Sequence, residues 1–375
     1  MTPSYDLAVV GAGVHGGTVA LLCARAGLKT VLVERGDLFR EASGVNAGTL
    51  TMQMTRVALI PYALRAHAMW ASARDWLGHD VGVVVCDGLS LAFTEGEEEL
   101  LAYRAGKRRE AGAPIELIGP ARAAEVEPGL GPGVRLAGYC RVDGFANAYL
   151  TGLAYGAALR EAGVAIRENT PVTGVEPSGG GYCLRTKGGE TIRARRVVLA
   201  GGVWLEPMLS WFGLNVPIEV LVNQLGVTER LAPVMRTVVG IASGLLSLKQ
   251  YPHGTVVIGG GWQGRGDRER GGVELVPESL IGNIRLACHA IPDLAASRLA
   301  RAWAGLEAET ADALPIAGPI PGHEDAYAIG SVHSGYTSGP YIAALLADRI
   351  LGREPALPLF PLDRLLPQPA ATVPA

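Results

Sequence analysis

The chain has few cysteines, few aromatic residues and little net charge. Its 375 residues include five scattered cysteines with no CxxC pair, which is typical of reduced thiols in a cytoplasmic protein without a metal site. Aromatic residues make up 6% of the chain and the net charge is −3, so we expect no nucleic-acid-binding surface. No apolar run approaches a membrane span, and no basic segment typical of a signal peptide precedes Asp6. A position at the inner membrane would require a partner protein.

What the sequence has in abundance is glycine, and the first glycines follow a recognisable pattern. Residues 5–33 predict a buried strand, a glycine turn, an apolar helix and a second strand, which Glu34 follows. Gly11 allows a tight turn, Gly13 lets the backbone approach a pyrophosphate, and Gly16 allows close helix–strand packing. Glu34 is placed to accept hydrogen bonds from a ribose. Compared with a purely structural glycine turn, this context favours dinucleotide binding.

Three further small-residue segments indicate one long cofactor. Residues 43–48 replace the regular strand–helix unit expected in a nicotinamide dehydrogenase. Residues 195–204 predict a buried strand that ends in glycines, and residues 328–330 lead into the small-residue run 333–340, which a helix follows. Strand ends far apart in sequence can converge on one extended ligand.

With these segments the chain resembles the FAD-dependent amine and amino-acid oxidoreductases, such as D-amino acid oxidase, glycine oxidase and sarcosine oxidase. The resemblance covers nearly the whole chain and includes residues 251–262 and 303–318. Residues 43–50, and 248–250 before 259–262, are most similar to a narrower branch. That branch contains the catalytic subunits of opine oxidase, hydrogen cyanide synthase and D-hydroxyproline- or proline-type dehydrogenases.

The resemblance implies an α/β fold of the glutathione-reductase type. A discontinuous Rossmann-like FAD-binding domain is expected over 1–80, 141–215 and 310–375, and an α+β substrate domain with a mixed sheet over 81–140 and 216–309. Within this frame, helical spacing predicts helices over 146–162 and 277–291. Short alternating strands with turns are expected from Val81. Residues 111–136 are expected to form loops with one short helix near 122–126.

The resemblance implies noncovalent FAD, since no residue stands out as a flavin tether. The expected FAD-binding residues are Gly11, Gly13, Val14, His15, Gly16, Glu34, Arg35, Ser43, Asn46, Ala47, Gly48, Leu50, Val172, Ala200, Gly201, Trp204, Gly305, Gly330, His333, Ser334, Gly335, Tyr336 and Thr337. Val172 is expected beside the adenine. The backbone from His333 to Thr337, at the start of the last helix, is expected near the pyrimidine ring of the flavin.

Five residues are candidates for substrate contact or catalysis. Lys249, Gln250 and Tyr251 lie on one predicted strand, with Lys249 and Tyr251 on one face and Gln250 on the other. Arg56 follows a segment expected to run under the flavin, and it could bind a carboxylate or form a surface salt bridge. His333 could line the active site or support it from behind.

One departure from the family pattern concerns Glu307. Many amino-acid-oxidising relatives carry an arginine after the Trp-Ala-Gly-Leu segment, to bind a substrate carboxylate. Here Trp303-Ala304-Gly305-Leu306 is followed by Glu307. Either another cation, Arg56 or Lys249, takes the carboxylate, or the substrate brings a positive group to Glu307. A solvated or partner-facing acid is the remaining alternative.

The function that these residues predict is FAD-dependent oxidation of a C–N bond in an amino acid or secondary amine, by hydride transfer and imine hydrolysis. A partner subunit that accepts the electrons is possible. The alternatives are an FAD-dependent 2-hydroxy acid dehydrogenase, a non-catalytic flavin-binding subunit, and an NAD-only enzyme.

Overall fold

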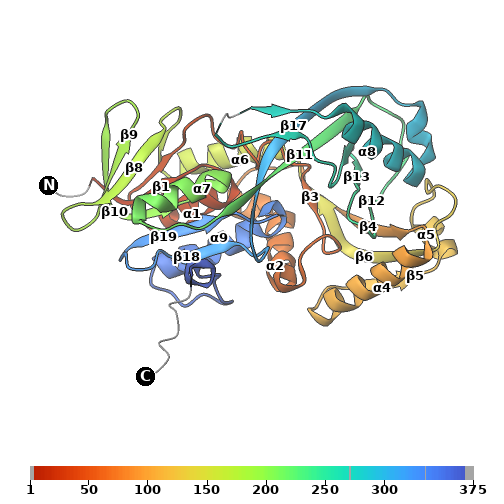
Figure 1. Cartoon of the computed structure of the whole chain (residues 1–375), viewed down its shortest axis with the longest axis horizontal. Coiled ribbons are helices and arrows are strands. Elements are labelled where there is room, and N and C mark those ends of the chain that lie inside the picture. Colours follow the sequence, from red (N-terminus) through yellow and green to blue (C-terminus); the bar gives the residue numbers. More distant parts are fainter. Residues whose placement is uncertain (1–3, 270–271, 334, 368–375) are drawn as a thin grey trace, which may run out of the picture.

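The computed structural model describes residues 4–269, 272–333 and 335–367, which form two sheets arranged along the long axis of the molecule (Figure 1). The first sheet has eight strands and the second has nine, and a two-stranded ribbon lies beside them. The sheets differ in strand direction. The first is mostly parallel around its centre and the second is mostly antiparallel.

The centre of the first sheet is built from the predicted N-terminal unit. Strand β1 (Tyr5–Val10) lies between β2 (Thr30–Val33) and β10 (Thr191–Leu199), and all three run parallel. The sheet continues through parallel β7 (Ala165–Arg167) on one side and β19 (Ala326–Gly330) on the other. Antiparallel β18 (Ile316–Pro319) closes one edge, and the hairpin of β8 (Val172–Pro177) and β9 (Tyr182–Thr186) pairs with β10.

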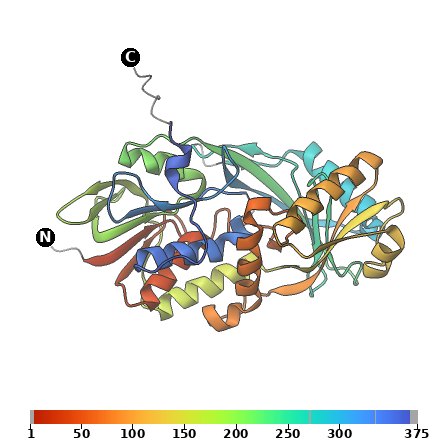
Figure 2. The same cartoon turned by 90° about the horizontal axis from the view of Figure 1, so that it is seen from below.

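Both faces of this sheet are covered, which explains why its strands are continuously apolar. Leu7 and Val9 face one core and Ala8 and Val10 face the other. Helices α1 (Val14–Arg25), α6 (Ala148–Glu161) and α9 (Gly335–Ile350) lie side by side on the first face (Figure 2). Helix α2 (Ile60–Ala71) packs on α9, and short α3 (Ala73–Leu77) follows it. Helix α7 (Leu205–Leu209) lies on the opposite face, with the second core.

The second sheet has the order β17-β11-β14-β13-β12-β4-β6-β3, with β5 beside β6. Its strands are β3 (Thr49–Leu50), β4 (Val84–Ala92), β5 (Ile115–Ile118), β6 (Leu136–Phe145), β11 (Ile218–Thr228), β12 (Val238–Ile241), β13 (Ser247–Gln250), β14 (Val256–Gly259) and β17 (Leu299–Thr310). Helix α8 (Pro277–Ala290) packs on β11 and β14, and α5 (Pro120–Val126) packs on β6. The ribbon is β15 (Arg265–Gly266) with β16 (Val273–Glu274).

Two features position the functional site. Strands β11 and β17 pair over almost their whole length, and Val222 and Leu306 on them pack into a core of the first sheet. These strands therefore carry the second sheet up to the first. Strand β6 crosses the boundary expected at residue 141, and β3 joins the second sheet from within segment 1–80. The division into an FAD-binding and a substrate domain stays a prediction.

Two expected segments are wrong. Residues 111–136 were expected to form loops with one short helix, but strand β5 forms at Ile115–Ile118 and pairs with β6. Residues 95–110 were included in the region predicted as short strands, but the structure forms helix α4 (Glu95–Glu110) there. The helix is mostly charged, so its apolar periodicity is weak. It is stabilised at its start by a capping box, in which the Thr94 side chain accepts from the Glu97 amide and the Glu97 carboxylate accepts from Thr94. The sequence Thr-x-x-Glu was the available indication of this helix. Among the described residues, none of the helices has the length and apolarity needed to cross a membrane.

Candidate functional site

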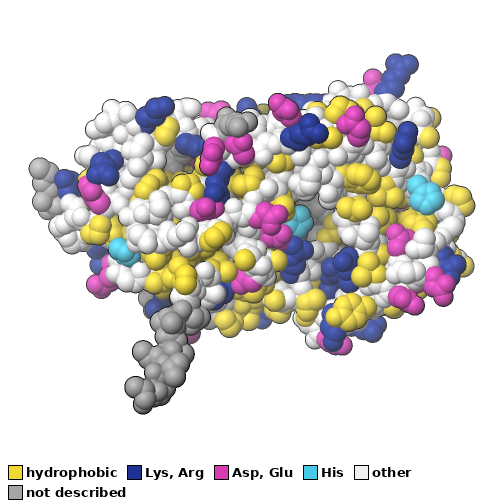
Figure 3. All heavy atoms as spheres, viewed as in Figure 1, with side chains coloured by type: hydrophobic (Ala, Val, Ile, Leu, Met, Phe, Trp, Pro, Cys, Tyr) yellow, Lys and Arg dark blue, Asp and Glu magenta, His cyan; other side chains and the backbone are white. Residues whose placement is uncertain are grey.

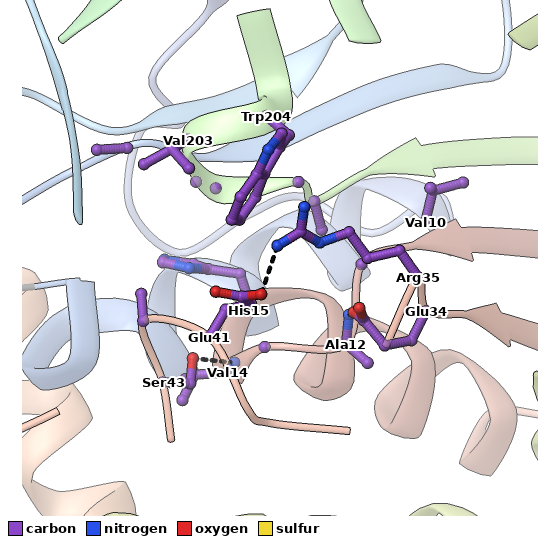
Figure 4. A pocket seen from close by; sticks show the side chains of 18 of the residues that line it. Val10, Ala12, Val14, His15, Glu34, Arg35, Glu41, Ser43, Val203 and Trp204 are labelled. Carbon is purple, nitrogen blue, oxygen red and sulfur yellow. Dashed lines mark hydrogen bonds and ion pairs between the residues drawn. The ribbon is translucent and has the colours of Figure 1, made fainter. Parts of the chain in front are cut away.

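The glycine turn after β1 forms the floor of a long cleft, here called the cofactor cleft (Figure 4). Gly11 has a φ of +106°, and a Cβ on it would lie 2.4 Å from the carbonyl oxygen of Ala200. A Cβ on Gly16 would lie 1.9 Å from the oxygen of Gly11. Gly13 is the N-cap of α1 and offers no side chain to the first turn, which also has no acidic residue. The positive end of α1 therefore opens into the cleft, as anion binding requires.

Two side chains fix this floor in place. The Glu34 carboxylate accepts hydrogen bonds from the backbone amides of Ala12, at 2.8 Å, and Gly36, at 2.9 Å. Its side chain borders the cleft from the end of β2, where the sequence placed a ribose-binding acid. From the small-residue run, the Ser43 hydroxyl accepts from the Val14 amide at 3.0 Å.

Most of the expected FAD-binding residues line this cleft. These are Gly11, Gly13, Val14, His15, Glu34, Arg35, Ser43, Asn46, Val172, Ala200, Gly201, Trp204, Gly330, Gly335 and Tyr336. The cleft thus runs from Val172 on β8, past the helix start, to Glu307 on β17. Seven expected residues do not line it: Gly16, Ala47, Gly48, Leu50, Gly305, His333 and Thr337. Ser334 lies outside the described residues.

For four of these seven residues, the position explains why that amino acid occurs there. A Cβ on Gly48 would lie 1.9 Å from the oxygen of Ala146, and one on Gly305 would lie 2.2 Å from Cγ2 of Val45. Both glycines therefore allow the small-residue run to pack closely. Leu50 is fully buried in the core beneath. The Thr337 hydroxyl donates to the oxygen of Thr49 and ties α9 to β3.

Opposite the glycine turn, a cation is stacked on an aromatic ring at the side of the cleft. The Arg35 guanidinium lies 3.3 Å from the centre of the Trp204 ring and also pairs with Glu41 (Figure 4). The Trp204 indole donates to the backbone oxygen of Arg268 at 3.0 Å. The sequence did not indicate that Glu41 or Arg268 would take part.

His15 provides a test of what the cleft can hold. His15 is half-buried, its Nε2 is shielded from solvent without a hydrogen-bond partner among the described residues, and burial lowers the pKa of the ring to about 4. Because the imidazole is neutral, it adds no charge of its own, and the start of α1 supplies the attraction for an anion in this part of the cleft. Together with the glycines, this fits a dinucleotide whose phosphates lie over the start of α1.

At the other end of the cleft lies a group of charged and polar residues, here called the β17 cluster: Glu307, Glu309, His333, Arg56 and Asn223. Glu307 and Glu309 lie on the same face of β17, since they are two residues apart. Nδ1 of His333 lies 2.8 Å from the Glu307 carboxylate, which Asn223 on β11 also contacts. Arg56 forms an ion pair with Glu309. Acidic, basic and histidine side chains gather around a hollow near the middle of the molecule (Figure 3).

The structure gives Arg56, Glu307 and His333 specific partners that the sequence did not indicate. Arg56 is already paired with an acid, so a substrate carboxylate would compete with Glu309 for it. The Glu307 side chain is only 16% exposed and lines the cleft, so it is not a solvated acid. Its hydrogen bond is the largest cause that raises the pKa of His333 above its ordinary value, and burial acts in the opposite direction.

The β13 candidates separate as the alternation predicts. Lys249 is fully buried, and its Nζ donates to the hydroxyls of Thr49 and Ser247. Burial lowers the pKa of Lys249 to about 7. Tyr251 points the same way, and its hydroxyl donates to the oxygen of Ala146 at 3.0 Å. Gln250 lies on the other face.

The Gln250 amide is occupied by backbone groups. It accepts from the amides of Val234 and Met235 and donates to the oxygens of Ala232 and Gly254. It therefore holds a loop to β13 and lies outside both the cofactor cleft and the β17 cluster.

Comparison with known proteins identifies the family. The family model described as FAD dependent oxidoreductase, DAO, matches residues 6–349. The chain belongs to this family. It is 29% identical to glycine oxidase of Geobacillus kaustophilus (strain HTA426), with 97% of each chain covered. It is 30% identical to a subunit of opine oxidase from Rhizobium meliloti, over 92% of this chain and 93% of the relative.

The fold agrees with this membership. The crystal structure of glycine oxidase from Geobacillus kaustophilus superposes with a TM-score of 0.87, at 26% identity, and covers 95% of this chain and 97% of the other. The expected family resemblance, fold class and FAD cofactor are thereby confirmed. The protein is an FAD-dependent oxidoreductase, and the lining of the cofactor cleft fits this cofactor.

Proposed function

We propose that this FAD-dependent oxidoreductase oxidises the C–N bond of an amino acid or secondary amine, of the opine, D-amino acid or proline type. The product is an imine, which water hydrolyses. The chemistry that bound FAD supplies is acceptance of a hydride from the carbon next to the nitrogen. The chain supplies orientation of the substrate and control of its protonation.

The observation that carries this proposal is the β17 cluster at the end of the cofactor cleft. Glu307 lines the cleft and is paired with His333, and Glu309 beside it is paired with Arg56. Acidic groups with basic partners can bind an ammonium group and also take up its proton. The names of the two relatives, a glycine oxidase and an opine oxidase, support the same substrate class.

The opine oxidase relative is named as one subunit of an assembly, which supports a second part of the proposal. We infer that this chain is the catalytic subunit of a complex whose partner accepts the electrons. Within the chain, the half built on the first sheet would bind FAD and the half built on the second sheet would bind the substrate.

An anaerobic titration of the purified protein tests the function. The flavin absorbance at about 450 nm is followed while single compounds are added. These are amino acids, N-alkyl amino acids, opines and 2-hydroxy acids. Bleaching by an amino compound, with a ketone or keto acid as product, is the expected result. Bleaching by hydroxy acids alone would overturn the proposal, as would a flavin that no compound reduces. Readmitting air then separates an oxidase from a dehydrogenase.

A further inference from the structure

The His333–Glu307 pair has the geometry of a base and the acid that orients it. His333 approaches Glu307 through Nδ1 at 2.8 Å. Glu307 is itself held by the Asn223 amide, whose oxygen accepts from Gln263 at 3.0 Å. An Nδ1–H donated to a carboxylate leaves Nε2 as the nitrogen with a free lone pair. The His333 side chain remains 37% exposed, so the ring is not enclosed in the core.

Amine oxidation creates a need for such a group. Alkyl amines have pKa values of about 8 to 10, so most substrate molecules arrive protonated at neutral pH. An ammonium nitrogen has no lone pair to assist the departure of a hydride from the neighbouring carbon. One proton must therefore leave before the oxidation.

We propose that Nε2 of His333 accepts this proton, and that Glu307 positions the His333 ring for it. The inference rests on the proposed function and assigns a residue to one of its steps. The N–H bond of the ammonium breaks, its electron pair stays on nitrogen, and an Nε2–H bond forms. Glu307 then faces an imidazolium, which its carboxylate stabilises. His333 is the catalytic residue and Glu307 is a positioning residue.

The pKa of His333 depends on the charged side chains around it. Glu307 and Glu309 approach it from β17, and Arg56 approaches from the segment before the short 3-10 helix Val57–Leu59. The two acids raise the pKa of His333, Glu307 as the largest cause and Glu309 as the smallest, while Arg56 lowers it. Removing either acid charge should therefore lower the pKa of His333, and Glu307 should have the larger effect.

The first test is the rate of flavin reduction as a function of pH. In His333→Gln the rate at about pH 7 should fall roughly 100-fold, because a general base is lost. The rate should recover toward that of the parent by about pH 10, where the substrate amine loses its proton unaided. A merely structural role predicts an equal loss at every pH. An H333Q profile parallel to that of the parent would overturn the inference.

The second test does not need turnover. The chain has seven histidines, and H333Q identifies the His333 resonance in a titration of the ring-labelled protein by NMR. Glu307→Gln should lower the pKa of this resonance clearly, and the matched control Glu309→Gln should lower it less. An unchanged pKa in E307Q would overturn the positioning role. Failure of the proposed function would look different, since no amino compound would then bleach the flavin of the parent.

Discussion

The cofactor cleft and the β17 cluster are built by different means. The floor of the cleft is formed by backbone and glycines within one continuous segment, from Gly11 to Glu34. The β17 cluster is formed by charged and polar side chains from four parts of the chain, at residues 56, 223, 307–309 and 333. The first arrangement tolerates no added atoms, while the second depends on pairing of charges.

The largest expected effect on FAD binding comes from an added methyl group in the cleft. In Gly11→Ala the Cβ would lie 2.4 Å from the oxygen of Ala200, at a φ that L side chains rarely adopt. We expect FAD binding to weaken by about 3 kcal/mol, roughly 100-fold, measured as flavin bound per chain and by flavin titration of the stripped protein. Gly96→Ala is the control, since a Cβ there meets nothing within 4 Å. A yellow, saturated G11A protein would contradict the steric account.

Lys249 sharpens the comparison, because it is a buried cationic residue with no acidic partner among the described residues, unlike the members of the β17 cluster. Its pKa is lowered to about 7 in the folded chain. The unfolded chain therefore binds the extra proton between about pH 7 and about pH 10, so the contribution of Lys249 to the free energy of unfolding rises with pH in this window.

Lys249→Met should remove this dependence. We expect the free energy of unfolding of the variant to rise relative to that of the parent as the pH falls from about 10 to about 7, by up to about 4 kcal/mol, since one pH unit in this window corresponds to about 1.4 kcal/mol. In the parent the Thr49 and Ser247 hydroxyls also form a hydrogen bond with each other, at 2.8 Å, so both keep a partner when the Lys249 amine is removed. Denaturant unfolding at several pH values measures the difference, with exposed Lys187→Met as the control. A difference that does not change with pH would show that Lys249 is not buried as a neutral amine.

The contrast between the two regions also explains what could be predicted from the sequence. The glycine turn and Glu34 were predictable because a local pattern encodes a local structure. The pairing of Glu307 with Asn223 depends on the register of β11 against β17, which joins residues 84 positions apart. Glu309 could have been found, since alternation along β17 places it on the same face as Glu307. Helix α4 was missed because its weak apolar periodicity outweighed its capping box.

A smaller effect is expected from the ion pair between Arg56 and Glu309. Their side chains are 39% and 18% exposed, so solvent screens the interaction in part. Arg56→Met should lower the free energy of unfolding by about 0.5 to 1 kcal/mol and leave the amount of bound FAD unchanged. A double-mutant cycle with Glu309→Gln isolates the coupling between the two side chains. Loss of flavin from R56M would show that the two regions are not separable.

An effect as small as that of the ion pair is expected at the side of the cleft opposite the glycine turn, where the Arg35 guanidinium stacks on the Trp204 ring. Arg35→Lys can keep the ion pair with Glu41, but a lysine cannot stack flat on Trp204 as the guanidinium does at 3.3 Å. We expect FAD binding to weaken about two- to fivefold, in line with about 0.5 to 1 kcal/mol for a stacked cation. In a Trp204→Leu background the same substitution should have almost no further effect. Equal losses in both backgrounds would mean that Arg35 acts on the cofactor through its charge and not through the ring.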